Sequence, residues 1–206
     1  MRNDFRNKSI GQRREFLASP LGVEKLVLGL TLDYSKFGYE DSHKECRVPY
    51  GAVLGKITAS GKFRLCTVGA LGADATATDT TIEIADRRNF SDEIQPIPFV
   101  AGDSIVIGFG TADVETKTID SIDYETRIVT LTAPLSNDHS EDDIVKCSDG
   151  SEDAVTILDE EADVTEDDYI AGGFRKAHIR EDLLPYELTT AEKTLLVANT
   201  GITFMA

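Results

Sequence analysis

Apolar and polar residues alternate over short stretches of this chain, and the pattern predicts strands. Residues 80–84 and 115–124 alternate in this way, with the period of a strand that buries one face. Three further apolar runs bounded by turn residues lie at 104–108, 128–131 and 144–147. Five short strands at roughly ten-residue spacing are typical of a small β-barrel or β-sandwich. We therefore expect a β domain over residues 72–148.

Strand signals also lie on both sides of that segment. Before it, Val53, Ile57, Phe63 and Leu65 are spaced for two short strands, and residues 59–62 form the hairpin turn between them. After it, apolar runs occur at 153–158, 171–179 and 202–205. We expect these two parts of the chain, 26–71 and 149–206, to close into one discontinuous β domain.

Two connecting segments have their own composition. Residues 69–77 are rich in Gly, Ala, Thr and Asp, which is typical of a linker. Residues 188–197 are the one stretch that predicts a helix, with Thr189 or Thr190 as the N-cap and an acidic residue in the first turn. The predicted fold is therefore mainly β with a short helix.

The first 25 residues mix charged and polar side chains without a strong period, and proline at position 20 interrupts any helix. We expect an extended arm over residues 1–25 that is flexible when free. The apolar run at 26–32 follows it. Two interpretations of this run stay open: a strand that pairs with an edge on another chain, and an ordinary internal strand of this domain.

Charge narrows the choice of partners. The chain carries a net charge of -16. Residues 1–25 hold six basic and three acidic side chains, a balance of +3, so the remainder carries -19. Such a body repels nucleic acid and anionic membranes, and an acidic protein surface is the expected partner of the basic arm. No apolar run has the length of a membrane helix, and the start lacks the pattern of a secretory signal.

Cysteine and acidic residues each leave two alternatives. The odd count of three cysteines, Cys46, Cys66 and Cys147, and the absence of CxxC spacing argue against a zinc site or a disulfide framework. Cys66 and Cys147 flank the middle segment, so they either pair or remain reduced thiols. We favour the reduced thiols because the expected compartment is reducing. Acidic side chains crowd residues 138–168. They form either a calcium site or a solvated face, and the absence of a calcium-loop motif favours the face.

No catalytic motif is present. The sequence has no zinc-binding helix motif, no serine nucleophile elbow and no phosphate-binding glycine loop. His178 lies between Lys176 and Arg180 and becomes a catalytic candidate only within a cleft. We expect it on a strand face or near a subunit contact. These observations predict a binding protein without catalytic residues, cofactor or metal, and not an enzyme.

Several short pieces, in this order, resemble the lambda-type head decoration proteins of tailed bacteriophages. The similar pieces are residues 50–58, 153–158, 171–175, 183–185 and 199–204. The resemblance covers roughly residues 20–70 and 150–206. Two departures are the insertion at 72–148, where smaller members have a loop, and a longer arm, so exact arm contacts do not transfer.

The resemblance implies a β-tulip decoration domain that assembles as a homotrimer on the outer surface of an expanded capsid. There it would clamp neighbouring major capsid protein subunits at three-fold and quasi-three-fold positions. It would be assembled in the host cytoplasm, bind no nucleic acid or membrane, and catalyse nothing. The residues implied in the capsid-binding arm are Arg13, Arg14, Phe16, Leu17, Leu21, Val23, Leu26, Val27 and Leu28. Those implied in the trimer or core motif are Tyr50, Phe174, Arg175, His178, Leu184 and Pro185.

The main alternative is an adhesin or carbohydrate-binding module that uses residues 72–148 to bind host-surface glycans. Such a site requires exposed aromatic side chains on one face. The aromatic residues of this segment are Phe90, Phe99, Phe109 and Tyr124. An acid-rich hydrolase is a third possibility, and no motif supports it.

Overall fold

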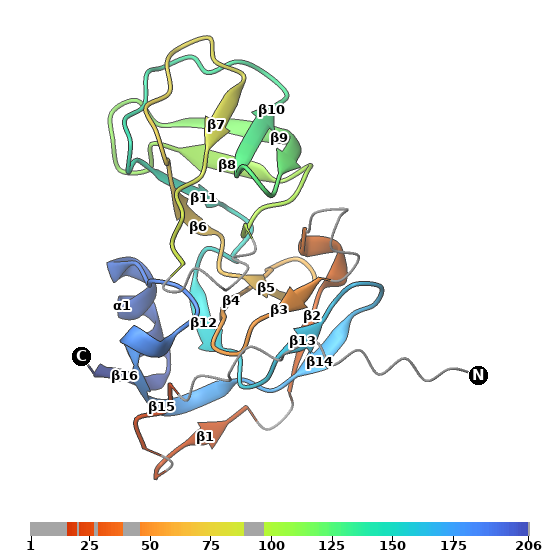
Figure 1. Ribbon diagram of the computed structural model, residues 1–206, viewed down its shortest axis with the longest axis vertical. Coiled ribbons are helices and arrows are strands. Elements are labelled where there is room, and N and C mark those ends of the chain that lie inside the picture. Colours follow the sequence, from red (N-terminus) through yellow and green to blue (C-terminus); the bar gives the residue numbers. More distant parts are fainter. Residues whose placement is uncertain (1–15, 20, 27–28, 39–45, 89–96, 206) are drawn as a thin grey trace.

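The computed structural model describes residues 16–19, 21–26, 29–38, 46–88 and 97–205 (Figure 1). The fold is mainly β with one short α-helix, as the sequence predicts. Its buried apolar residues form two separate clusters. One cluster combines residues from Phe16 to Val68 with residues from Ala154 to Ile202, and we call this part the core domain. The other contains residues between Leu71 and Cys147 only, and we call it the inserted domain.

The inserted domain is built on a six-stranded sheet in the order β6-β11-β8-β9-β10-β7. All paired neighbours are antiparallel. The sheet curls until its two ends meet at an isolated bridge between Leu71 and Ile84. The strands are β6 (Val68–Ala70), β7 (Thr81–Glu83), β8 (Ser104–Ile107), β9 (Glu115–Asp123), β10 (Ile128–Leu131) and β11 (Ile144–Cys147).

Alternation explains this sheet, because residues at every second position point to the same face. Ile105 and Ile107 on β8, Val129 and Leu131 on β10, and Val145 on β11 are all buried inside the curl. All five predicted strands are present. The interpretation of residues 69–77 as a linker is wrong at its start, because β6 pairs with β11 from Val68 to Ala70. Strand pairing uses backbone groups, so small side chains do not prevent it.

The core domain contains three sheets. The largest has the order β12-β4-β5-β2-β14, a second has the order β1-β15-β16, and the third pairs β13 with β3. Two short 3-10 helices, η1 (Tyr34–Lys36) and η2 (Glu181–Leu183), accompany them. The strands are β1 (Glu24–Lys25), β2 (Leu30–Leu32), β3 (Arg47–Val48), β4 (Val53–Lys56), β5 (Phe63–Leu65), β12 (Ala154–Ile157), β13 (Ala162–Asp163), β14 (Tyr169–Ala171), β15 (Phe174–Arg180) and β16 (Gly201–Met205).

The single α-helix, α1 (Thr190–Asn199), connects β15 to the parallel strand β16. Thr189 is its N-cap: the Thr189 hydroxyl accepts a hydrogen bond from the Glu192 amide, and the Glu192 carboxylate accepts one from the Thr189 amide. This reciprocal pair satisfies two backbone donors at the helix start. Leu196 is buried against the core domain. Within the described ranges no helix has the length and apolar character needed to span a membrane.

Candidate functional site

The described N-terminal residues lie along strand β15. The Arg180 amide donates a hydrogen bond to the Phe16 carbonyl at 2.7 Å, and the Ala18 amide donates one to the His178 carbonyl at 2.8 Å. Further along, β1 pairs with β15 in antiparallel register, with Glu24 opposite Lys176. We call residues 16–19 and 21–25 the N-terminal segment. It extends the β1-β15-β16 sheet along one edge.

Phe16 anchors this segment in the core domain. Its side chain is fully buried. Its ring centroid lies 4.2 Å from that of Tyr50, and 5.9 Å from that of Phe174 in an edge-on arrangement. Gly51, with φ at +91°, makes room for it, because a Cβ atom there would lie 2.9 Å from both Phe16 and Pro185. Phe16, Tyr50, Phe174 and Pro185, which the sequence assigned to an arm and to a separate motif, therefore meet at one place.

The expected arm over residues 1–25 is wrong for its described part. Phe16 belongs to the main apolar cluster, and Leu17, Val23 and Leu26 pack against that cluster. Leu21 is the exception, with 79% of its surface exposed. The physical reason is the hydrophobic effect: burying an apolar side chain in the core of its own domain is favourable in free energy compared with leaving it in water.

The remaining arm residues divide in two. Arg13, Arg14, Val27 and Leu28 lie outside the described residues. In the run at 26–32, Leu30 to Leu32 form β2, which pairs with β14 and with β5 of the same domain. For these three residues the internal-strand interpretation holds.

The other predicted motif residues divide between the interior and the surface. Leu184 and Pro185 are buried. Arg175 and His178 are exposed on β15. The Nδ1 atom of His178 lies 2.6 Å from the Thr203 hydroxyl on β16. His178 is therefore on a strand face, one of the two positions expected for it.

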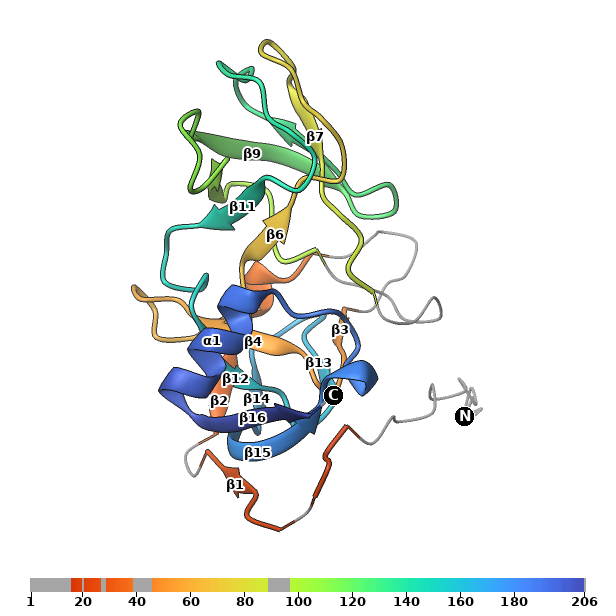
Figure 2. The same cartoon turned by 90° about the vertical axis from the view of Figure 1, so that its left-hand side faces the viewer.

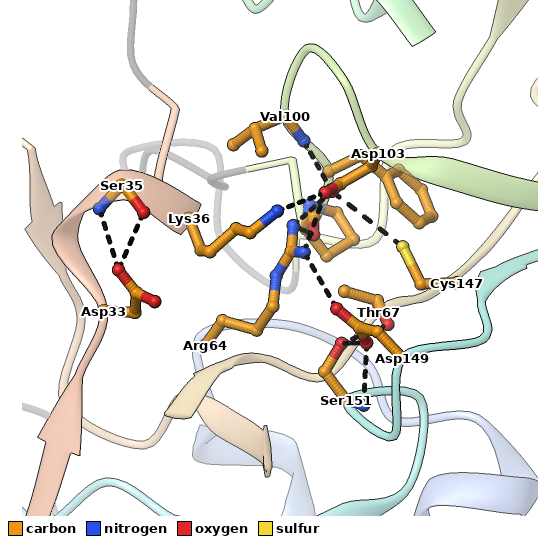
Figure 3. A network of polar contacts seen from close by, with 12 residues as sticks. Asp33, Ser35, Lys36, Arg64, Thr67, Val100, Asp103, Cys147, Asp149 and Ser151 are labelled. Atoms are coloured by element: carbon orange, nitrogen blue, oxygen red, sulfur yellow. Dashed lines mark hydrogen bonds and ion pairs between the residues drawn. The ribbon is translucent and has the colours of Figure 1, made fainter. Parts of the chain in front are cut away.

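A buried ion pair connects the two domains (Figure 3). Arg64 is fully buried on β5 of the core domain. Its Nη1 atom donates to Asp103 Oδ1 at 3.1 Å, and its Nη2 atom donates to Asp103 Oδ2 at 2.5 Å. Nη2 also donates to the Pro98 carbonyl at 2.9 Å. Asp103 precedes β8 of the inserted domain, so this guanidinium connects one domain to the other.

Lys36, the Val100 amide and the Cys147 thiol also donate to Asp103. Lys36 Nζ lies 2.8 Å from Asp103 Oδ1, and the Val100 amide donates to Oδ2 at 3.0 Å. Burial alone would raise the pKa of Asp103, but the hydrogen bonds and charges of Arg64 and Lys36 outweigh burial and lower it. Burial likewise would lower the pKa of Arg64, and Asp103 raises it. Both groups are therefore held in their charged forms.

A second connection joins the inserted domain to helix α1. Arg87, which follows β7, donates from Nη2 to Glu192 Oε2 at 2.5 Å and from Nη1 to the Val68 carbonyl at 2.9 Å. The Glu187 amide donates to the Arg87 carbonyl at 2.8 Å. Glu192 is the buried carboxylate that also caps the helix. The same residue thus stabilises the helix start and connects it to the inserted domain.

Neither Arg64 nor Arg87 is among the residues that the sequence indicated. Arg64 carries no signal in the sequence, because strand alternation places its side chain on the face opposite to Phe63 and Leu65, where an exposed arginine is expected. A buried arginine requires a charged partner. No pattern in the sequence points to Asp103 as that partner, since it is one of many acidic residues.

The three cysteines are free and buried. Burial, with the Asp103 carboxylate nearby, raises the pKa of Cys147 to about 12. Burial and Asp163 raise the pKa of Cys46 to about 11. The reduced alternative for Cys66 and Cys147 is therefore the one found.

In the described part of the chain, no group of three or more His, Cys, Asp or Glu side chains could hold a metal ion.

The inserted domain holds a polar cluster around Glu115. His139 Nε2 lies 3.0 Å from Glu115 Oε1, Lys117 Nζ lies 2.8 Å from Oε2, and the amides of Ser136 and Asn137 donate to the same carboxylate. Burial alone would raise the pKa of Glu115, but these donors outweigh it and lower the pKa to about 2. These contacts connect the loop before β11 to strand β9 and hold it in place.

No protein-family model matches the chain, and no curated protein matches it in sequence.

Proposed function

We propose that this chain is a structural virion protein that binds as a trimer to the outside of an expanded phage capsid. It would occupy three-fold and quasi-three-fold positions and cement neighbouring major capsid protein subunits, without catalysis. One observation carries the proposal: the pieces that resemble decoration proteins come from both sides of the insertion and belong to a single apolar cluster. That cluster is complete without the inserted residues.

The position of the N-terminal segment supports a role in attachment. It lies along β15, at the end of the molecule opposite the inserted domain (Figures 1 and 2). The residues before Phe16 carry five basic and two acidic side chains. In the proposed function they contact an acidic surface on the shell, and the anchor at Phe16 fixes where they leave the core domain.

The charge of the inserted domain supports the same orientation. Residues 72–148 hold sixteen acidic and five basic side chains, a balance of -11. An acidic shell would repel this domain and attract the basic start of the chain. In the proposed arrangement the inserted domain projects outward from the capsid, and the buried pair of Arg64 and Asp103 holds it at a fixed angle.

Three copies in one trimer would strengthen a weak individual contact. Ordering a terminal segment on a shell costs conformational entropy, and linking three segments raises their effective concentration at the surface. Binding that is restricted to the expanded shell stabilises that shell by mass action. These effects require no catalytic group and no cofactor.

The direct experiment is sedimentation of purified protein with expanded and with compact heads of the phage that encodes it. The proposal expects the protein to be trimeric by light scattering and to sediment with expanded heads only. A stable monomer that binds neither form of the head would overturn it. Equal binding to both forms would contradict the role in stabilising the expanded shell.

A carbohydrate-binding role for the inserted domain is the second candidate, and one observation favours it. Phe109 is 47% exposed, and the ammonium of Lys146 lies 3.4 Å from its ring centroid. Phe99, in contrast, is fully buried, and Tyr124 packs against the same apolar cluster. Phe90 lies outside the described residues. A glycan array with labelled protein tests this role, and the absence of any signal would remove it.

A further inference from the structure

The second half of helix α1 and strand β16 present a stretch without charged side chains in a strongly acidic protein. From Thr194 to Met205 the sequence has no Asp, Glu, Lys or Arg. We call the exposed residues of this stretch the α1–β16 surface; they are Thr194, Val197, Ala198, Asn199, Gly201, Thr203 and Met205. Val197 and Met205 are each 50% exposed although both are apolar.

Strand β16 adds a second unusual property. It is the last strand of its sheet in the described part of the chain, with β15 as its only partner. Natural edge strands are usually protected from pairing by charged residues, proline or bulges. Strand β16 reads Gly-Ile-Thr-Phe-Met and has none of these. Figure 2 shows α1 and β16 together on one side of the core domain.

We infer that the α1–β16 surface is the contact between copies of this chain. Two bodies that each carry a net charge of -16 repel across most of their surfaces. They approach most easily where neither presents a carboxylate. This surface has none, and the neighbouring strand β15 exposes Lys176 and Arg180 beside it rather than acidic residues. A basic partner would gain more by binding the acidic faces, so an uncharged surface favours a second copy.

This inference rests on the proposed function for the number of subunits, and it names the surface on which the trimer depends. It also predicts a distinctive response to salt. Salt screens the repulsion between acidic bodies and leaves an uncharged contact unchanged, so association strengthens as salt rises. A contact made of ion pairs would weaken under the same conditions.

The test measures self-association by light scattering and sedimentation velocity over a range of protein and salt concentrations. The substitutions Val197→Glu and Ala198→Glu add a charge to exposed positions of α1. The matched controls are Ile170→Glu and Leu21→Glu, which change apolar residues that are 74% and 79% exposed elsewhere on the molecule. A thermal unfolding transition for each variant verifies that it is folded.

We expect the two α1 variants to associate at least about tenfold more weakly than the wild type, and the two controls to associate like the wild type. Unchanged association of both α1 variants would overturn the inference while leaving the proposed function intact. So would association that weakens with salt. A wild type that is monomeric under all conditions would overturn both the inference and the trimer, whereas binding of that monomer to expanded heads would still support attachment.

Discussion

Arg64 and Asp103 form a two-pronged ion pair whose side chains are 0% and 3% exposed and which belong to different domains. Among the described residues, removing Asp103 leaves the buried Arg64 with only the partly exposed Asp149, at 3.6 Å, as a charged partner; breaking a buried pair in this way costs about 3–5 kcal/mol. The pair is therefore one of the contacts that set how the inserted domain sits on the core domain, together with Arg87 and Glu192.

We expect Asp103→Asn to lower the free energy of unfolding by about 3–5 kcal/mol, measured by chemical denaturation at neutral pH. The matched control is Glu161→Gln, which removes the carboxylate partner of Arg47 at the surface, where the side chains are 47% and 52% exposed. Exposed pairs contribute about 0–1 kcal/mol. Equal effects of the two substitutions would contradict the structural role assigned to Asp103.

A second prediction concerns the anchor of the N-terminal segment. Phe16→Ala removes a fully buried ring and should lower the free energy of unfolding by about 3–5 kcal/mol. Leu21→Ala, at an exposed position of the same segment, should change it by less than about 0.5 kcal/mol. If Phe16→Ala is as mild as Leu21→Ala, the segment is not anchored as described.

Truncation separates folding from attachment. Deletion of residues 1–15 leaves Phe16 in place, so the truncated protein should keep the wild-type thermal transition while losing its binding to expanded heads. Deletion of residues 1–25 also removes Phe16 and β1 and should lower the transition temperature. Normal head binding after deletion of residues 1–15 would refute the proposed role of the basic start of the chain.

The Glu115 cluster predicts a dependence of stability on pH. The pKa of Glu115 is about 2 in the folded protein and 4.5 as the ordinary value. A carboxylate with a lowered folded pKa stabilises the fold above its unfolded pKa, and this contribution is lost as the pH falls toward the folded pKa. The contribution of Glu115 should therefore be complete at neutral pH and disappear between about pH 4.5 and pH 2.

Glu115→Gln measures that contribution. The difference in unfolding free energy between wild type and variant should be large at pH 7 and should shrink steadily below pH 4.5. Glu125→Gln, at an exposed position, is the control and should change stability by less than about 0.5 kcal/mol. A difference between wild type and Glu115→Gln that stays constant from pH 7 to pH 3 would contradict the ionised, hydrogen-bonded state of Glu115.

The cysteines give a fifth prediction. Because Cys46, Cys66 and Cys147 are buried and burial raises the pKa of each thiol, the reactive thiolate is scarce in the folded protein. All three should resist a thiol reagent at pH 8 and react fully in denaturant. Rapid labelling of any of them without denaturant would show that its surroundings are more open than described.

Local sequence signals predicted local structure well. Strands β8 to β11 and helix α1 follow from alternation, turn residues and the Thr189 cap, which depend on neighbours along the chain. Strand β6 was missed because its residues, Val68 to Ala70, are small and its pairing with β11 is set by contacts distant in sequence. No local pattern reports such pairing.

The candidate site was less accessible to sequence reasoning. Phe16 lies in a polar, charged stretch, and its burial depends on a space that Tyr50, Gly51 and Phe174 form together. The partnership of Arg64 with Asp103 joins residues on different domains, and the sequence offers many acidic residues as alternatives. Both features arise from tertiary packing, so the residues were visible in the sequence but their contacts were not.

The most direct test of the proposed function is a cryo-EM reconstruction of expanded heads of the encoding phage after incubation with the purified protein. The proposal predicts trimeric protrusions on three-fold and quasi-three-fold axes, with the core domain against the shell and the inserted domain pointing outward. Heads without added density at those axes, or density in which the inserted domain contacts the shell, would contradict it.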